Sequence, residues 1–148
     1  MDKVFIVHGR DASMKNRVEE FIKSLGLEPI ILHKQANRGG TIIEKIEKCA
    51  EDVKYAIILL SPDDFGGIKN KRDEAKPRAR QNVIFEFGLF VGLIKRSNIA
   101  LLRKGDVEIP SDAAGMGYIV YSRKNNWRQD LRMELEKAGV IPAIEVYS

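Results

Sequence analysis

The chain of 148 residues has one cysteine, Cys49, and two histidines. A single cysteine excludes a disulfide bond within the chain and favours a reducing compartment, so we expect a cytoplasmic protein. No apolar run reaches the roughly 18 residues that a transmembrane helix needs. The apolar stretch near the N-terminus is also too short for a signal peptide. We therefore expect no membrane as a partner.

A strong excess of charge of one sign is also lacking. The net charge of +4 and the pI near 9.2 are mildly basic, which suits an anionic small molecule and gives no indication of nucleic acid as a partner. One basic cluster has no interleaved aromatic residues, unlike a single-stranded nucleic-acid site. This cluster is typical of a solvated loop, although it would also neutralise a diphosphate. It comprises Lys69, Lys71, Arg72, Lys76, Arg78 and Arg80.

Short, continuously apolar runs alternate with segments of helical spacing. The apolar runs predict strands at 4–7, 29–32, 55–60, 99–102 and 118–121. Caps and periodicity predict helices between them: one that ends at Gly26, one that opens at the capping box Thr41–Glu44, one that starts near Arg78 or Ala79, and one between Asn126 and Gly139. We predict a long loop at 65–78.

Apolar strands that alternate with helices are typical of a parallel sheet covered on both faces. Five such units predict an α/β domain with the flavodoxin-like, doubly wound strand order. A single domain would span residues 1–148, with a core at about 3–139 and a C-terminal tail at 140–148. In this strand order, the ligand crevice lies at the carboxyl ends of the first and third strands.

Polar residues follow both of these strands. The two sets are His8, Gly9, Arg10 and Asp11 after the first strand, and Ser61, Pro62, Asp63 and Asp64 after the third. His8 and Gly9 are also compatible with a plain strand end. Adjacent aspartates after a proline are more typical of a turn and cap than of a metal site, so we expect no bound metal.

The helix that starts at Thr41 offers two weaker candidates. Gly39 and Gly40 precede it, and helix N-termini favour anions such as phosphate, although a mobile loop explains the glycines equally well. Cys49 shares the apolar face of this helix, which predicts a core residue instead of a nucleophile. The other members of that face are Ile42, Ile46 and Val53.

One carboxylate interrupts the most apolar run of the chain. Glu86 is the only ionisable residue from Val83 to Ile94, in a helix that is apolar nearly all round and hence predicted to be buried. Burying a carboxylate is costly unless it finds a partner or stays protonated. A structural ion pair with Arg10 or Arg80 is one interpretation. The other is a carboxylate that faces the crevice, where Asn82 offers an amide to the same ligand.

Five motifs occur in an order that resembles a known family. They are VFIVHGRD at 4–11, LEPIIL at 27–32, GTIIEK at 40–45, LSPDD at 60–64 and RQNVIFEFG at 80–88. Over about residues 3–122 they resemble the bacterial TIR-like family of predicted nucleotide-binding proteins. That family includes the TIR domains of antiphage effectors that respond to cyclic nucleotides, some of them fused to STING domains.

The resemblance implies a TIR fold and an activity. TIR enzymes hydrolyse NAD+ to nicotinamide and an ADP-ribose product, with one glutamate on the helix after the third strand, and Glu86 matches that position. NAD+ is then the substrate, and no separate cofactor is expected. The resemblance also implies self-association through TIR–TIR contacts, in which the loop His33–Gly40 often takes part. A sensor domain or a cyclic-nucleotide-dependent activator is a further expected partner.

The predicted site therefore has Glu86 as its catalytic residue. The residues expected to bind NAD+ around it are His8, Gly9, Arg10, Asp11, Gly40, Thr41, Asp63, Asp64, Arg80 and Asn82. Animal and plant TIR domains commonly carry a tryptophan where this chain has Asn82, so stacking on nicotinamide must come from elsewhere. The candidates for stacking are Phe5, Phe65 and Phe85.

The leading interpretation is an NAD+ glycohydrolase that is active when assembled or induced, and two other functions stay open. One is a non-catalytic TIR module that binds a nucleotide or self-associates. The other is an enzyme like a nucleoside deoxyribosyltransferase, which also uses a glutamate in a similar fold. A phosphoreceiver domain needs an acidic pair after the first strand, where this chain has His8 and Gly9.

Overall fold

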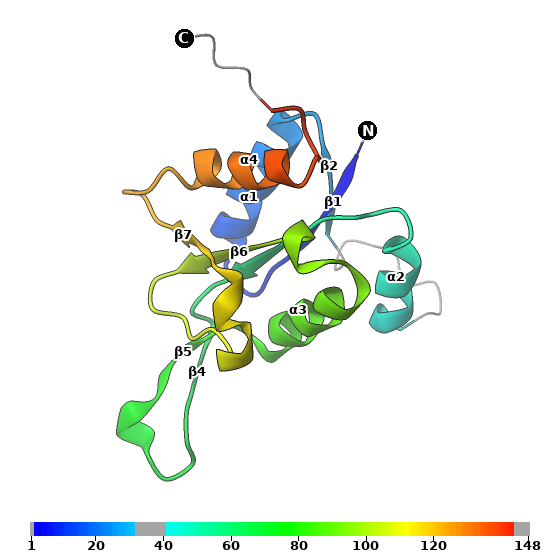
Figure 1. The fold of residues 1–148 in the computed structure, drawn as a ribbon. Helices are drawn as coiled ribbons and strands as arrows, with labels where there is room; N and C mark the ends of the chain where they lie inside the picture. Colours follow the sequence, from blue (N-terminus) through cyan, green and yellow to red (C-terminus); the bar gives the residue numbers. More distant parts are fainter. Residues whose placement is uncertain (1, 32–40, 144–148) are drawn as a thin grey trace.

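The computed structural model describes residues 2–31 and 41–143 and has a parallel sheet at its centre (Figure 1). The strands of this sheet are β1 (Lys3–Val7), β2 (Glu28–Ile31), β3 (Ala56–Leu60), β6 (Ile99–Lys104) and β7 (Ile119–Tyr121). They lie in the order β2-β1-β3-β6-β7, and every neighbouring pair is parallel. The predicted five-stranded α/β sheet with flavodoxin-like order is confirmed.

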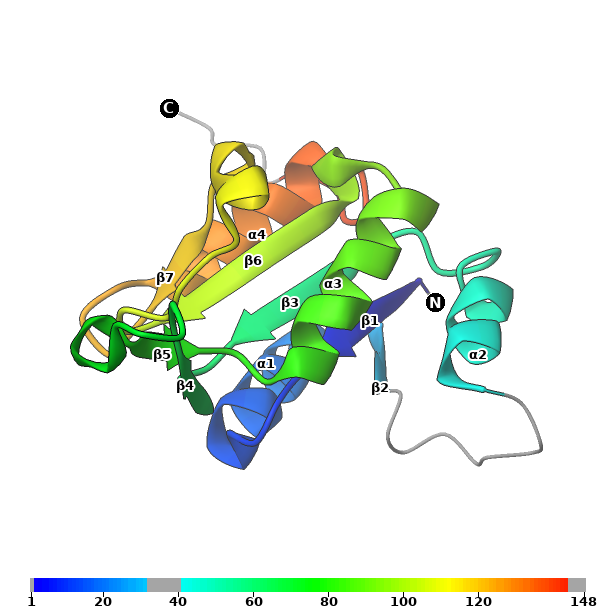
Figure 2. The ribbon, with the colours of Figure 1, turned by 90° about the horizontal axis from the view of Figure 1, so that it is seen from below.

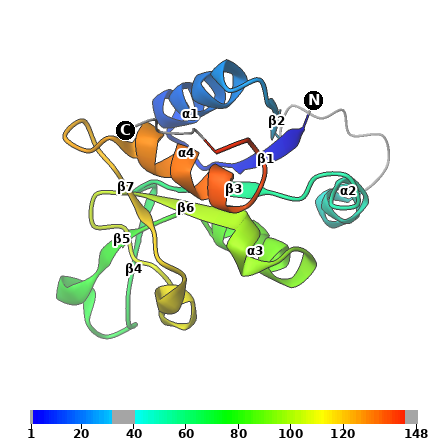
Figure 3. The ribbon, with the colours of Figure 1, turned by 45° about the horizontal axis from the view of Figure 1, so that its top comes forward.

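Helices cover both faces of the sheet (Figure 3). α1 (Ala12–Ser24) and α4 (Trp127–Lys137) lie on one face, and α2 (Ile42–Cys49) and α3 (Gln81–Leu93) lie on the other. Successive strand residues serve the two sides in turn, since Ile6 packs in the core below α1 and α4 while Phe5 packs in the core below α3. The winding reverses between β1 and β3, whose carboxyl ends point to the same edge (Figure 2).

The segment predicted as a long loop contains a small antiparallel ribbon. β4 (Asp64–Gly66) pairs with β5 (Lys76–Arg78), and a 3-10 turn, η2 (Arg72–Glu74), lies between them. The ribbon projects from the sheet as an arm (Figure 1). The prediction of a continuous loop is wrong because strands this short, one of them with a proline, leave no periodic signal in the sequence.

The helix that carries Glu86 begins later and is less buried than predicted. Arg78 belongs to β5, and Arg80 is an extended N-cap with ψ of 142°, so α3 starts at Gln81 and places Glu86 about one and a half turns in. One face of α3 packs on the sheet, whereas Phe85 is 53% exposed. The prediction of burial all round is wrong because α3 is an outer-layer helix.

The peripheral segments follow the sequence expectations in part. Ile46 of α2 and Val53 after it are buried as predicted, but Ile42, in the first turn of α2, is 45% exposed, so its predicted burial is wrong. Two further 3-10 turns, η3 (Arg96–Asn98) and η4 (Ser111–Met116), flank β6. Ile141 of the predicted tail is buried against the core of α1 and α4. Within the described ranges, every helix is too short or too polar to cross a bilayer.

The ends of β1 and β3 come very close together at Gly9. A Cβ atom at this position would lie 1.8 Å from Oδ2 of Asp63, far inside van der Waals contact. The hydroxyl of Ser61 lies 3.5 Å from the same point. A side chain at position 9 would therefore displace the carboxylate of Asp63.

Replacing Gly9 should destabilise the fold, whereas an equivalent change in α3 should not. We expect Gly9→Ala to lower the free energy of unfolding by about 1–3 kcal/mol, because Asp63 must move. Gly88→Ala is the matched control: its Cβ meets no atom within 4 Å, and alanine in a helix is worth about 0.5–1 kcal/mol over glycine. Denaturant unfolding measures both, and equal stability of the two variants would contradict the close approach.

Candidate functional site

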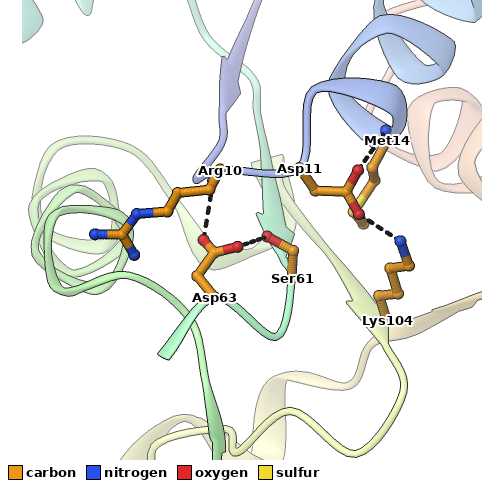
Figure 4. A network of polar contacts seen from close by, with 6 residues as sticks. All are labelled: Arg10, Asp11, Met14, Ser61, Asp63 and Lys104. Atoms are coloured by element: carbon orange, nitrogen blue, oxygen red, sulfur yellow. Dashed lines mark hydrogen bonds and ion pairs between the residues drawn. The ribbon is translucent and has the colours of Figure 1, made fainter. Parts of the chain in front are cut away.

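Two polar segments that are far apart in the sequence meet at the carboxyl edge of the sheet (Figure 4). Oδ2 of Asp63 accepts a hydrogen bond from the backbone N–H of Arg10 at 3.1 Å, and Oδ1 accepts one from Ser61 Oγ at 2.8 Å. The guanidinium of Arg10 donates to Asp64 at 2.6 Å. The structure thus brings together residues predicted after the first and third strands.

Asp11 is engaged within the fold on both of its oxygens (Figure 4). Oδ1 accepts the N–H of Met14 at 3.0 Å and caps α1, and Oδ2 forms an ion pair with Lys104 at the end of β6. Burial raises the pKa of this carboxyl, but Lys104 and the backbone N–H groups outweigh it, so the pKa is lowered. A direct contact between Asp11 and a ligand stays a prediction.

The other predicted binding residues outside α3 occupy strand and helix ends. His8 follows β1, with Nδ1 at 2.9 Å from the carbonyl oxygen of Gly9. Thr41 caps α2, and its Oγ1 accepts the N–H of Glu44 at 3.1 Å, so the Thr41 half of the predicted capping box is confirmed. Gly40 and the rest of the loop 33–40 lie outside the described residues.

A cavity of about 660 Å³ opens beside the Asp63 network. Its lining includes three arginines, Arg10, Arg78 and Arg80, together with Phe65 and Asn82. Arginines next to a helix N-terminus suit an anion such as a phosphate. The other members of the predicted basic cluster are exposed along the arm: Lys69, Lys71, Arg72 and Lys76.

Glu86 lies one turn after Asn82 on the same side of α3. It is 4% exposed, and among the described residues it forms no hydrogen bond or ion pair. The two predicted structural partners are not used, because Arg10 binds Asp64 and Arg80 acts on Glu86 only through its charge. Burial raises the pKa of Glu86 to about 7, and the positive charge of Arg80 opposes that rise. The fold buries this carboxylate without using it.

The three aromatic candidates for stacking differ in their exposure. Phe5 is fully buried on a central strand, with its ring centroid 4.7 Å from that of Phe90, so the prediction that it stacks on a ligand is wrong. Phe85 points away from the sheet on α3. Phe65 is 78% exposed on β4 and lines the arginine-rich cavity, which makes it the best placed of the three.

Several residues at the site were not predicted from the sequence, among them Lys104 and Glu108. Lys104 ends β6 at the same edge as Asp11, and the rule that parallel strands share a carboxyl edge could have found it. Glu108 binds Arg78, with 2.6 Å between Nε and Oε2, and its backbone N–H donates to the carbonyl of Pro77 at 2.8 Å. Glu108 lies in an irregular loop after β6, and no sequence pattern predicts its contact with Arg78.

The structure offers neither a cluster of metal ligands nor an exposed thiol among the residues that it describes. Within the part of the chain that the structure describes, no group of three or more His, Cys, Asp or Glu side chains could hold a metal ion. Cys49 is partly buried and packs against the core below α3, as the sequence predicted.

Comparisons with known proteins identify the family. The profile described as CAP12/Pycsar effector protein, TIR domain, matches residues 3–123. The chain belongs to this TIR-domain family. The protein YuaY of Escherichia coli K12 is 45% identical over 93% of this chain, which spans 46% of YuaY. Protein tirC of Dictyostelium discoideum is 37% identical over 90% of this chain and 68% of its own length. The Pycsar effector protein PaPycTIR of Pseudomonas aeruginosa is 40% identical over 53% of this chain and 25% of its own length.

Solved structures share the fold at low sequence identity. A prokaryotic SEFIR domain has a TM-score of 0.57 and 12% identity, covering 99% of this chain and 100% of its own. The CMP N-glycosidase BcmB of Clostridium botulinum has a TM-score of 0.53 and 16% identity, covering 88% of this chain and 99% of its own. Both solved structures therefore have the same overall fold as this TIR domain.

Glu86 should make the stability of this TIR domain depend on pH. Its carboxyl titrates near 4.5 in the unfolded chain and near 7 in the fold, so the folded state binds more protons between these values. The free energy of unfolding should therefore fall as the pH rises from about 4.5 to about 7, by no more than about 2 kcal/mol. Glu86→Gln should lack this part of the dependence in denaturant unfolding at several pH values. The same profile in both proteins would show that Glu86 titrates normally.

Proposed function

We propose that this TIR domain is an NAD+ glycohydrolase, with Glu86 as its catalytic residue. The observation that carries the proposal is a buried carboxylate without a structural partner, one turn from Asn82 and the arginine-lined cavity. The motif at 80–88 supports it as well, because it places Glu86 where TIR enzymes have their glutamate. The arginines would hold the diphosphate of NAD+, which is the substrate, and the reaction needs no separate cofactor.

The chemistry suits a site with one carboxylate. The bond between C1′ of the ribose and the ring nitrogen breaks, and its electron pair neutralises the cationic ring, so nicotinamide leaves without a proton donor. The ribose develops positive charge in an oxocarbenium-like transition state. An ionised Glu86 would stabilise that charge strongly in a site that excludes water. Water then adds to C1′ and loses a proton to give ADP-ribose, or an internal nucleophile closes a cyclic product.

Self-association and activation by a second domain belong to the same proposal. Ile42, Ile43 and Phe85 are between 42% and 53% exposed on α2 and α3, and such apolar surface favours contact between copies of the chain. The relative PaPycTIR bears the name of a Pycsar effector and extends well beyond its matched region. We therefore propose that the chain acts in cytoplasmic antiphage defence, together with a sensor domain or a cyclic-nucleotide-dependent activator.

A non-catalytic module that binds a nucleotide is the main competitor. The arginine-lined cavity would serve such a module without any role for Glu86. A third possibility is cleavage of another N-glycosidic bond, as in the fold neighbour BcmB, which is named for its action on CMP. Product analysis with NAD+ and CMP separates the three, because the module releases no base and the third activity releases cytosine.

Glu86→Gln should abolish nicotinamide release while the fold is kept. The amide preserves the size of the side chain but cannot carry the negative charge, and we expect a loss of at least about 100-fold in kcat. Glu20→Gln is the matched control, because Glu20 is exposed on α1 on the opposite face of the sheet. Release of nicotinamide is measured on concentrated protein with and without a crowding agent. Wild-type rates in Glu86→Gln would refute the catalytic assignment.

The pH dependence of the reaction should report Glu86 and its neighbour Arg80. Since the ionised form is required, kcat/KM should rise with pH through an apparent pKa near 7. Arg80→Gln removes a charge that lowers this pKa, so the rise should move to higher pH. Arg123→Gln, at an exposed position after β7, should leave the profile unchanged. A profile that does not move in Arg80→Gln would assign the titration to another group.

A further inference from the structure

A second, smaller cavity adjoins the one lined by arginines. It has a volume of about 290 Å³ and is lined by Ala79, Ile84 and Pro110, with Arg78, Gln81 and Glu108 at its polar side. Arg78, Ala79 and Gln81 also line the larger cavity, so the two spaces are neighbours. Three segments of the chain build the smaller one: the turn between β5 and α3, the first turn of α3, and the loop after β6.

The two cavities lie on different sides of the start of α3. Asn82 and Glu86 are one turn apart and share a side of the helix. Ile84 comes two residues after Asn82, which rotates its side chain by roughly 200° around the helix axis. A ligand that reaches from Glu86 to the cavity beside Ile84 must therefore pass over the N-terminal end of α3.

That passage suits a diphosphate. The first N–H groups of a helix have no acceptor within the helix and point toward a bound anion. Arg80, the N-cap of α3, makes no capping hydrogen bond with its side chain, and Arg10, Arg78 and Arg80 surround the larger cavity next to it. The larger cavity thus holds three arginines and one carboxylate, Asp64, which pairs with Arg10, whereas the smaller cavity shares Arg78 and balances it with Glu108.

The smaller cavity has the features of a site for a flat, uncharged ring. Ile84 and Pro110 supply apolar walls, as ligand pockets for aromatic groups do. Its polar side offers acceptors and donors: the amide of Gln81 and the carboxylate of Glu108, whose Oε2 is taken by Arg78. An exocyclic amino group could donate to such a carboxylate.

We propose that the cavity between Ile84 and Pro110 binds the adenine of a dinucleotide that is bent over the N-terminus of α3. This inference rests on the proposed function, in which the nicotinamide riboside half lies beside Asn82 and Glu86. The diphosphate crosses the first turn of α3 among the arginines, and the adenosine half descends on the other side. The cavity would thus distinguish NAD+ from smaller nicotinamide nucleotides.

Binding without turnover tests the proposal on the wild-type chain. Isothermal titration with AMP and with ribose 5-phosphate compares ligands that differ by the base alone. We expect AMP to bind at least about tenfold more tightly, a factor that corresponds to about 1.4 kcal/mol. Equal affinities, or no binding of either ligand, would overturn the adenine site.

Variants that fill the smaller cavity test whether the adenine base binds there. Ile84→Trp fills it from the helix and Pro110→Trp from the loop, and we expect either to weaken binding of ADP-ribose at least about tenfold without changing the affinity for ribose 5-phosphate. Val91→Trp, at an exposed position farther along α3 and outside both cavities, is the control. Thermal unfolding identifies the variants that fold. Wild-type affinity for ADP-ribose in a folded, filled variant would overturn the proposal.

The outcome is separable from that of the proposed activity. If the wild-type chain binds ADP-ribose through this cavity but releases no nicotinamide, the adenine site stands and the glycohydrolase proposal fails. If nicotinamide is released and the filled variants have an unchanged KM for NAD+, the activity stands and the adenine site fails. If both proposals hold, filling the cavity raises KM for NAD+ and leaves cleavage of nicotinamide mononucleotide unchanged.

Discussion

The carboxylate of Asp63 fixes the edge of the sheet on which the site is built. It accepts hydrogen bonds from the backbone of Arg10 and from Ser61, and it occupies the space that a side chain on Gly9 would need. β1 and β3 are thereby locked together where the winding of the sheet reverses. The segment that follows β3 leads through β4 and β5 to Arg80 and the start of α3. The Asp63 contact thus adds to the pairing of β1 with β3 at the edge from which the chain runs to the arginines and to Glu86.

The burial of Glu86 follows from the geometry of α3 and not from any bond that the fold makes with it. Val83, Phe87 and Phe90 hold the helix on the sheet, and Glu86 lies at the border of that same buried face. An apolar residue at position 86 would have no desolvation penalty. A buried carboxylate must either be protonated or have a positive charge beside it. The stability of the fold therefore does not explain why a carboxylate occupies this position. The site therefore accounts for the residue better than the fold does.

The sequence alone predicted the sheet, its order and the edge where the polar segments meet, because continuous apolar strands and capped helices leave periodic signals. It did not predict the β4–β5 arm or the first residue of α3, since three-residue strands and an extended Arg80 leave no periodic signal. One of its two interpretations paired Glu86 with Arg10 or Arg80, whereas Arg10 binds Asp64. Distances between side chains from different loops, such as Arg78 and Glu108, depend on backbone positions that no pattern encodes. The larger cavity lies at the predicted crevice and is lined by the predicted residues Arg10, Asp64, Arg80 and Asn82, whereas the smaller cavity was not predicted.

The charges around α3 also suggest how binding and ionisation are linked in the proposed reaction. With a pKa of about 7, Glu86 is protonated in part of the molecules at neutral pH. A cationic nicotinamide ring beside it would favour the ionised form, so substrate binding would release the proton and prepare the carboxylate for the developing charge on the ribose. Arg80 opposes the protonation of Glu86 in the free domain, yet it lies toward the cavity proposed for the diphosphate. Once phosphate neutralises Arg80, the substrate's own cation becomes the main charge that keeps Glu86 ionised. Discrimination against neutral nicotinamide would then follow from electrostatics, because a neutral ring leaves the buried carboxylate protonated.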